Sequence, residues 1–298
     1  ATDGITTNTA GTSNFVAGAN AGNSIVSGGN YNTVVGDEAG TAITTGDQNT
    51  FVGAFSGETT ATSADNTGLG LSALRANTGA SNTALGSQAL RNNTTASNNT
   101  AVGKSALYLN TTGARNTATG ALSLDANTTG NYNTANGYNT LGSNTTGTHN
   151  TAVGDYSQFA NTTGIKNVSV GQGAFATNTT GSQNTAIGQG SLAYNTTADN
   201  NTAVGYDSLV ANTTAIRNSA FGSLALTTNT TGAENTAVGY ASMTGNTTGS
   251  DNTAIGRSSL QNNTTGGNNV AVGRNALIQS TTADNNTAVG YSSLVSNT

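Results

Sequence analysis

The side chains that most often perform catalysis or hold metal ions are sparse in this chain of 298 residues. There is no Cys, and the one His, His149, falls at a predicted corner where solvent is expected. The 13 Asp and Glu residues follow no fixed spacing: Asp37 and Glu38 are adjacent, whereas Asp155 directly follows a Gly. Acid–base catalysis and metal binding both need such groups in a defined arrangement. The sequence therefore predicts no catalytic residue, no metal site and no cofactor, and we expect the protein not to be an enzyme.

Amide and hydroxyl side chains, by contrast, recur with a strict period. The phrase Asn-Thr-Ala-Val-Gly, or a close variant, returns every 17 residues from Asn32 onward, in sixteen copies that all begin with Asn. One step is shorter, from Asn66 to Asn82, where a Thr is missing and the period resumes afterwards. Such self-similarity is typical of a repeat protein whose turns stack on one another. We number the places of one turn from first to seventeenth, beginning at this Asn.

The first two places of the turn are the best candidates for regular polar arrays. Identical Asn side chains one strand spacing apart can form a hydrogen-bonded ladder that satisfies both donor and acceptor of each amide. The predicted structural Asn ladder contains Asn99, Asn116, Asn133, Asn150, Asn184, Asn201, Asn235, Asn252 and Asn286. The Thr after each Asn can form a similar column, either inside a small core or on a flat face. The candidate ice-facing or ligand-facing Thr ladder contains Thr100, Thr117, Thr134, Thr151, Thr185, Thr202, Thr236, Thr253 and Thr287.

A second Asn column occupies the twelfth place, where most turns contain an Asn-Thr-Thr triplet. The triplet matches the acceptor motif for N-linked glycosylation, so in an organism that glycosylates exported Asn these residues would line one edge with glycans. Alternatively, Asn-Thr is simply the favoured chemistry of a corner, and the match is compositional. The possible glycosylation sites are Asn110, Asn127, Asn144, Asn161, Asn178, Asn195, Asn212, Asn229, Asn246 and Asn263.

The backbone that positions these columns must also repeat every 17 residues. Such a unit is too short for a pair of helices, and it carries Gly and β-branched residues where a helix favours Ala, Leu, Glu or Lys. In one turn, Thr202 to Val204 has the composition of a short strand, and Gly205 supplies a corner with positive φ. Ser208 and Leu209 are expected to start a second strand. The sequence thus predicts an all-β fold, a parallel β-solenoid (β-roll) of about 17 turns.

Two apolar columns are the expected core. The fourth place is apolar in fourteen of the sixteen copies, as at Val204, and the turns with the exceptions Thr119 and Asn136 are expected to be the softest. The ninth place is mostly Leu, so we expect Val to stack on Val and Leu on Leu. Small residues fill the third place, as at Ala203, and the eighth, as at Ser208. We expect these two columns to allow close approach of neighbouring chains, and tight packing within one chain is the alternative.

Composition predicts one elongated domain, because no Pro, charge run or change in composition marks a linker. Residues 1–31 depart from the strict period and are expected to be an irregular N-terminal cap or joint, followed by sixteen repeats in residues 32–298. A net charge of −5 with 7% charged residues argues against a nucleic-acid partner. No segment is apolar enough to be embedded in a membrane. An Asn-, Thr-, Ser- and Gly-rich surface, without an initiator Met, suits a processed extracellular or cell-surface protein.

At this point the repeats resemble a known group of proteins. Residues 99–107 and 201–209 resemble the head repeats of trimeric autotransporter adhesins and the related repeats of phage tail-fibre-like proteins, and the resemblance covers about residues 32–298. It implies a left-handed parallel β-roll, assembled as a homotrimer or filament, exposed on a cell or virion and used for attachment to host-surface or matrix molecules. The Asn-Thr-Thr-Gly element, as in residues 127–130, is additional to the shorter adhesin unit.

A second resemblance implies a different function. Residues 22–28 and 32–36 are similar to the Asn-x-Val-x-Gly repeats of plant ice-binding β-rolls, in which a Thr ladder could order water into an ice-like array. Thr-x-Thr occurs only sporadically, as at residues 60–62, and adjacent Thr residues of a strand should point to opposite faces. We therefore expect a non-enzymatic extracellular structural or adhesive fibre, with ice binding as the alternative function.

Overall fold

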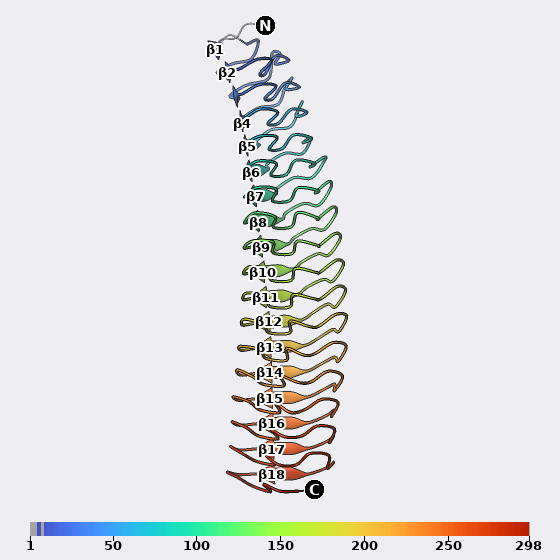
Figure 1. The fold of residues 1–298 in the computed structure, drawn as a ribbon. Coiled ribbons are helices and arrows are strands. Elements are labelled where there is room, and N and C mark those ends of the chain that lie inside the picture. Colours follow the sequence, from blue (N-terminus) through green and yellow to red (C-terminus); the bar gives the residue numbers. More distant parts are fainter. Residues whose placement is uncertain (1–4, 7–8, 298) are drawn as a thin grey trace. The chain divides into compact units, whose positions relative to one another are not determined.

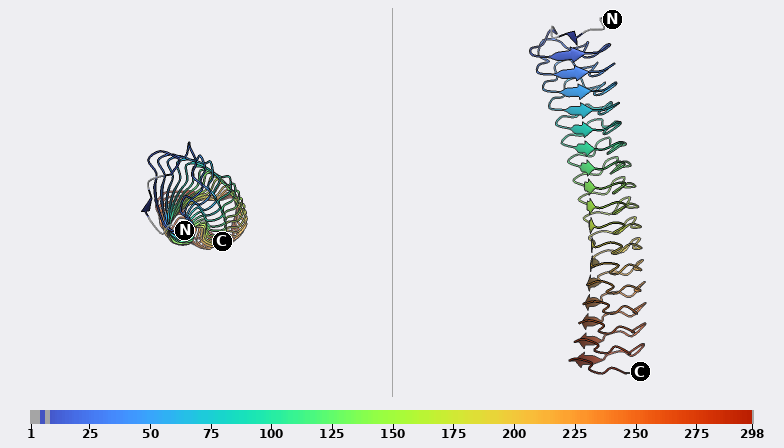
Figure 2. Two further views of the ribbon diagram at one scale, coloured as in Figure 1. Left: turned by 90° about the horizontal axis from the view of Figure 1, so that it is seen from above. Right: turned by 60° about the vertical axis from the view of Figure 1, so that its left-hand side comes forward.

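The computed structural model describes residues 9–297 and the backbone of residues 5–6, in two compact units, residues 1–149 and 150–298. Residues 1–4 and 7–8 of the expected cap, and Thr298, lie outside the described residues. Both units are built alike: each turn contributes one short strand, and the rest of the turn runs through bends and corners back to the next strand (Figures 1 and 2). The predicted β-solenoid is confirmed in each unit.

The described residues of the first unit form nine strands. β1 pairs antiparallel with β2, and every later strand of the unit pairs parallel with the strand before it. The strands are β1 (Ile5–Thr6), β2 (Phe15–Ala17), β3 (Thr33–Val35), β4 (Thr50–Val52), β5 (Thr67–Leu69), β6 (Thr83–Leu85), β7 (Thr100–Val102), β8 (Thr117–Thr119) and β9 (Thr134–Asn136). Residues 14–31 form a further turn of the stack, because β2 pairs with β3 and Asn14 Oδ1 accepts a hydrogen bond of 2.8 Å from the Asn32 N–H.

In the second unit, residues 150–297 form nine strands that all pair in parallel and in chain order. They are β10 (Thr151–Val153), β11 (Val168–Val170), β12 (Thr185–Ile187), β13 (Thr202–Val204), β14 (Ser219–Phe221), β15 (Thr236–Val238), β16 (Thr253–Ile255), β17 (Val270–Val272) and β18 (Thr287–Val289). Equal places of successive turns are neighbours, as Thr185 and Thr202 are. Each column of the sequence is therefore a physical column in the structure.

The register continues through the short step in the first unit. Thr67 pairs with Thr83 although one residue is missing between them, and Asn66 Oδ1 accepts a hydrogen bond of 3.0 Å from the Asn82 N–H. The corner absorbs the deletion: Asn77 Nδ2 donates to the Gly79 carbonyl at 2.8 Å. Strand pairing and the Asn column together hold the phase, while the corner varies in length.

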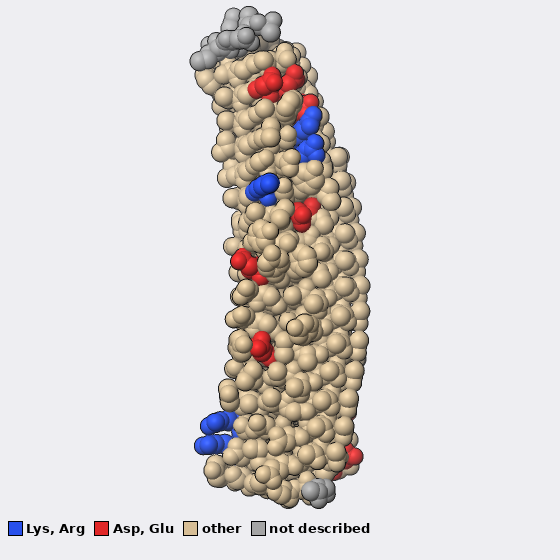
Figure 3. Space-filling model, viewed as in Figure 1, with Lys and Arg blue, Asp and Glu red and all other residues tan. Residues whose placement is uncertain are grey.

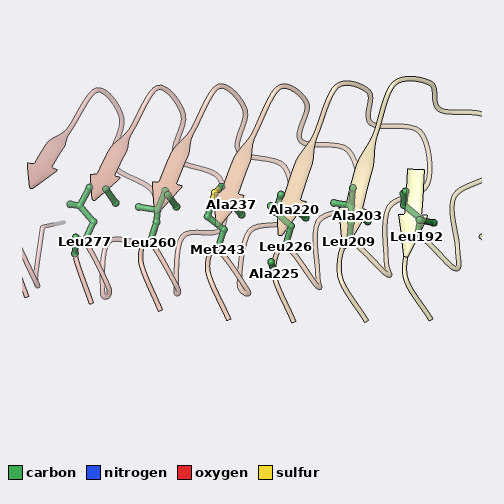
Figure 4. Packing of buried hydrophobic residues seen from close by; sticks show 14 of the residues in the cluster. Leu192, Ala203, Leu209, Ala220, Ala225, Leu226, Ala237, Met243, Leu260 and Leu277 are labelled. Carbon is green, nitrogen blue, oxygen red and sulfur yellow. The ribbon is translucent and has the colours of Figure 1, made fainter. Parts of the chain in front are cut away.

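The core lies at the third and ninth places. Ala203 in the middle of β13 and Leu209 in the following turn are both 0% exposed, and Figure 4 shows the Leu column of the second unit stacked beside the Ala column of the strands. The expected Leu column is confirmed. The expected fourth-place core is wrong, because strand residues alternate between faces and the inward position belongs to Ala. Fourth-place residues such as Phe221 and Ile255 are each 42% exposed.

A narrow coil explains why the inward strand residue is small. The interior of one turn accommodates one large side chain, which is usually the ninth-place Leu, opposite an Ala. Where the third place is large, the ninth is small: Phe51 is fully buried, and a Cβ added at Gly57 would lie 2.5 Å from its ring. The summed side-chain volume of the third and ninth places therefore stays nearly constant, because a large residue at one place is accompanied by a small one at the other.

The small-residue columns face the interior of their own chain. Because their members are already fully buried in a single copy, they cannot form the contact surface with a neighbouring chain that we expected, and the alternative of tight packing within one chain holds. The residues concerned are Ala101, Ala118, Ala152 and Ala203 at the third place and Ala106, Ser191 and Ser208 at the eighth.

The expected second strand is absent from the described turns. Asp207 and Leu209 have φ of 49° and 52°, so this segment alternates through the left-handed region and forms a tight turn. Gly205 has φ of 137°, as its corner position predicted. The turns with Thr119 and Asn136 were expected to be the softest because these polar residues were assigned to the core. Both residues lie on the outer face of the strand, so this reason does not apply.

Candidate functional site

The first-place Asn side chains link each turn to the next. The Asn201 N–H donates to Asn184 Oδ1 at 2.9 Å, and Asn201 Nδ2 donates to the Ala215 carbonyl of its own turn at 2.9 Å. The ladder therefore runs mainly from side chain to backbone, and only some turns add an amide–amide bond, such as Asn252 to Asn235 at 3.1 Å. All nine predicted ladder residues take part, and all except the part-buried Asn286 are at most 1% exposed.

The amide–amide ladder lies instead at the twelfth place. Asn212 Nδ2 donates to Asn195 Oδ1 at 2.8 Å and to the Ala215 carbonyl at 3.0 Å. All ten possible glycosylation sites belong to this column and are 0% exposed. The nitrogen that would carry a glycan is buried and already donates within the chain, so the folded turn has no room for the modification. The first-place ladder is thus present, and sequence reasoning missed the second ladder at the twelfth place because it read those Asn residues only as corners or glycosylation sites.

The second and fourth places form one continuous surface in each unit, which we call the outer sheet face. In the first unit it consists of Thr33, Val35, Thr50, Val52, Thr67, Leu69, Thr83, Leu85, Thr100, Val102, Thr117, Thr119, Thr134 and Asn136. In the second unit it consists of Thr151, Val153, Val168, Val170, Thr185, Ile187, Thr202, Val204, Ser219, Phe221, Thr236, Val238, Thr253, Ile255, Val270, Val272, Thr287 and Val289. The candidate Thr ladder therefore lies outside the core, beside a column of Val and Ile.

The outer sheet face is uncharged and partly apolar. No Asp, Glu, Lys or Arg occupies its second or fourth places in any of the sixteen repeats. Val153 and Ile187 are 36% and 39% exposed, which is high for aliphatic side chains on a sheet. No described Thr hydroxyl of the second place donates to another protein group, so these hydroxyls remain open to water or to a partner. Sequence reasoning missed this surface because it assigned the fourth place to the core.

A second exposed column of Thr lies at the fourteenth place. Its members include Thr214, Thr231 and Thr248, and they are separate from the outer sheet face. The thirteenth-place Thr beside them differs, because its hydroxyl donates to the backbone of the next turn, as from Thr213 to the Thr230 carbonyl at 3.2 Å. The triplet Asn-Thr-Thr therefore divides its three side chains between the core, the backbone of the next turn and solvent.

The described titratable side chains include an aromatic stack and a half-buried carboxylate. His149 stacks on Tyr132 with the ring centroids 4.8 Å apart, and the Arg115 guanidinium lies 5.3 Å from the same ring. Burial raises the pKa of Asp125, and hydrogen bonds from backbone N–H groups partly oppose this shift. In the described residues, no three His, Cys, Asp or Glu side chains come close enough to hold a metal ion. The geometry thus identifies an extended surface, the outer sheet face, as the candidate functional site.

Two further observations concern the class of protein. None of the described residues forms a helix with the length and apolar character needed to cross a membrane. No protein-family model matches this chain, and a search of curated proteins likewise finds no match.

Proposed function

We propose that the protein is a non-enzymatic, extracellular structural or adhesive β-solenoid that assembles with copies of itself into a homotrimer or a longer filament. The observation that supports this proposal is the outer sheet face, which is uncharged in every repeat: Thr fills most of its second places, and an apolar residue fills all of its fourth places except Thr119 and Asn136. Contiguous exposed apolar surface on a soluble protein marks a site of interaction.

The periodicity of this face favours a second copy of the same chain as its occupant. Neighbouring strands lie about 4.8 Å apart, so a partner can match Val against Val over many turns only if it repeats at the same distance. Another copy has that spacing, the same absence of charge and the same apolar column. The resemblance of the repeats to adhesin heads and tail-fibre-like proteins supports the same assembly, and the left-handed coil that it implies stays a prediction.

Solution mass tests the assembly directly. Light scattering on the purified chain of 29.3 kDa should give about three chain masses or a polydisperse filament. The triple variant Val204→Glu, Val238→Glu and Val272→Glu places charges on alternate turns of the outer sheet face and should reduce the mass to that of one chain.

The matched control for the assembly places the same charges on another exposed column. The variant Thr214→Glu, Thr248→Glu and Thr282→Glu changes the net charge equally in corresponding turns and should keep the mass of the unmodified protein. A single-chain mass for the unmodified protein at high concentration would contradict self-assembly. Equal loss of assembly in both variants would show that net charge, rather than the outer sheet face, controls the mass.

Ice binding is the second candidate function, and one observation favours it: the second-place Thr hydroxyls lie on an exposed face without protein partners. Replacing Thr185, Thr202, Thr236 and Thr253 by Lys should abolish any ice affinity if this column is the ice face. The control replaces Thr197, Thr214, Thr248 and Thr265 of the fourteenth place in the same way. Ice affinity that survives the first set of substitutions and disappears with the second would assign the activity to the fourteenth-place column.

A further inference from the structure

Two arginines in the second unit lie side by side on an exposed edge. Arg257 and Arg274 occupy the sixth place of successive turns, directly after the Gly that follows β16 and β17. Figure 3 shows a pair of basic side chains projecting from the left-hand edge near the C-terminal end, with no acidic side chain beside them on the visible face. The backbone that carries the pair is fixed, because the Asn275 N–H donates to the Arg257 carbonyl at 3.1 Å.

These two arginines differ from the other four of the chain, each of which has a polar partner on its own chain. Arg75 and Arg217 form ion pairs with Glu58 and Glu234, and Arg91 and Arg115 donate to the hydroxyl groups of Tyr108 and Tyr132. Neither Arg257 nor Arg274 forms an ion pair or a side-chain hydrogen bond. The two arginines without a polar partner are therefore also the two that lie next to each other. Their like charges repel unless an anion lies between them.

A Tyr flanks each arginine on the outer side of the pair. The Arg257 guanidinium carbon lies 5.8 Å from the centre of the Tyr240 ring, and that of Arg274 lies 5.9 Å from the Tyr291 ring. The sixth-place column thus reads Tyr, Arg, Arg, Tyr over four successive turns. Stacking on an aromatic ring uses the face of a guanidinium and leaves its N–H edge free to donate.

The geometry points to a binding site for an acidic polysaccharide, that is, a sugar polymer that carries carboxylate or sulfate groups. The free N–H edges of Arg257 and Arg274 would hold the oxyanion through paired charge-assisted hydrogen bonds. The exposed Tyr240 ring would contact the sugar ring next to it, and the half-buried seventh-place Asn275 supplies a polar group beside Arg274. A nucleic acid is the less favoured anion, because the rest of the surface carries excess negative charge.

This inference specifies the class of ligand for the proposed adhesive function, and it therefore rests on that proposal. Solution mass tests assembly, whereas ligand binding tests the site, so that either can fail alone. The probes are polygalacturonate, dextran sulfate, neutral dextran and a single-stranded DNA oligonucleotide, with binding to the full chain measured by titration calorimetry. We expect binding of at least one of the two charged polysaccharides and none of dextran.

Matched variants locate the binding. Arg257→Gln with Arg274→Gln should weaken polysaccharide binding at least tenfold. Arg115→Gln with Arg217→Gln removes the same charge elsewhere and should change the affinity for the polysaccharide less than twofold. Tyr240→Ala should weaken binding, and Tyr240→Phe, which keeps the ring, should not.

Several results would overturn the inference. They are the absence of binding to either charged polymer, equal effects of the two arginine pairs, tighter binding of the oligonucleotide than of the polysaccharides, and displacement of the polymer by inorganic sulfate at an equal concentration of charge. The last result would show a site that recognises a bare anion and no sugar. Circular dichroism of each variant identifies any loss of binding that comes from unfolding.

Discussion

Replacing Leu209 by Ala should destabilise its turn far more than replacing Val204 by Ala, although both are aliphatic and lie in the same repeat. Leu209 is 0% exposed and stacks with Leu192 and Leu226, whereas Val204 lies on the outer sheet face. The Leu substitution removes three buried carbons, worth about 2.4 kcal/mol at roughly 0.8 kcal/mol per buried methylene group. A cavity term is added, because hydrogen bonds pin the turns on either side and limit collapse of the site.

The expected cost of Leu209→Ala is therefore about 3 kcal/mol, within the range of about 2–5 kcal/mol typical of such substitutions. The positive φ of Leu209 does not alter this value, since Ala has a Cβ as well and experiences the same backbone strain. Val204→Ala removes two carbons that are already partly in water, so it should cost less than about 1 kcal/mol.

Hydrogen–deuterium exchange measured on peptides is the suitable assay, because a solenoid need not unfold in a single step. A cost of about 3 kcal/mol in local opening corresponds to an increase of roughly 100-fold in the exchange rates of amides in the turns from 192 to 226, and Val204→Ala should change them less than about fivefold. The comparison requires a dilute sample of single chains, since Val204 belongs to the proposed contact face. Equal acceleration by both substitutions would refute the assignment of the core to the third and ninth places.

Two more predictions concern a corner and a carboxylate. Gly205→Ala should destabilise the fold by more than about 3 kcal/mol, because its φ is 137° and the new Cβ would lie 2.5 Å from the Gly222 carbonyl carbon. Gly173→Ala is the matched control: its φ is 62° and no atom lies within 4 Å of the new Cβ, so it should cost only about 1 kcal/mol. Thermal melts of the two variants measure the difference. Asp125→Asn should raise the melting temperature at neutral pH. Burial raises the pKa of Asp125 in the folded state above its usual 3.8, so its ionisation costs stability as the pH rises through this interval. The advantage of Asn should therefore shrink as the pH falls below 3.8, and a gain that does not depend on pH would point to another cause.

The period of the sequence predicted the stack, the strand and the Leu column, because each follows from spacing and residue type alone. The short strand at Thr202–Val204 and the corner at Gly205 are examples. Which face of a three-residue strand points inward was harder to predict, since Ala203 and Val204 are both acceptable in a core. The packing decides: in the turns with a Leu at the ninth place, as at Leu209, the interior has space for the methyl group of Ala and not for Val.

The division of roles between the two Asn columns could not be predicted for a different reason. Asn201 and Asn212 have the same side chain and the same period, and the difference between them depends on which backbone groups each amide meets. Near the first place an N–H of the next turn is available, so Asn201 Oδ1 binds the Asn218 N–H at 2.9 Å. At the twelfth place, Asn212 Oδ1 instead meets the amide of Asn229, at 3.4 Å. A sequence pattern carries no information about such local geometry.

The bond from each Asn side chain to the backbone of the following turn makes the two ends of a turn complementary to each other. Each turn accepts a backbone hydrogen bond from the turn after it and donates the same hydrogen bond to the turn before it. Excision or duplication of one whole repeat therefore recreates the same junction between turns. Recombination within the gene can then lengthen or shorten such a chain by whole turns without designing a new contact. Selection can therefore adjust the number of repeats, and with it the length of the solenoid, without changing the fold of each turn.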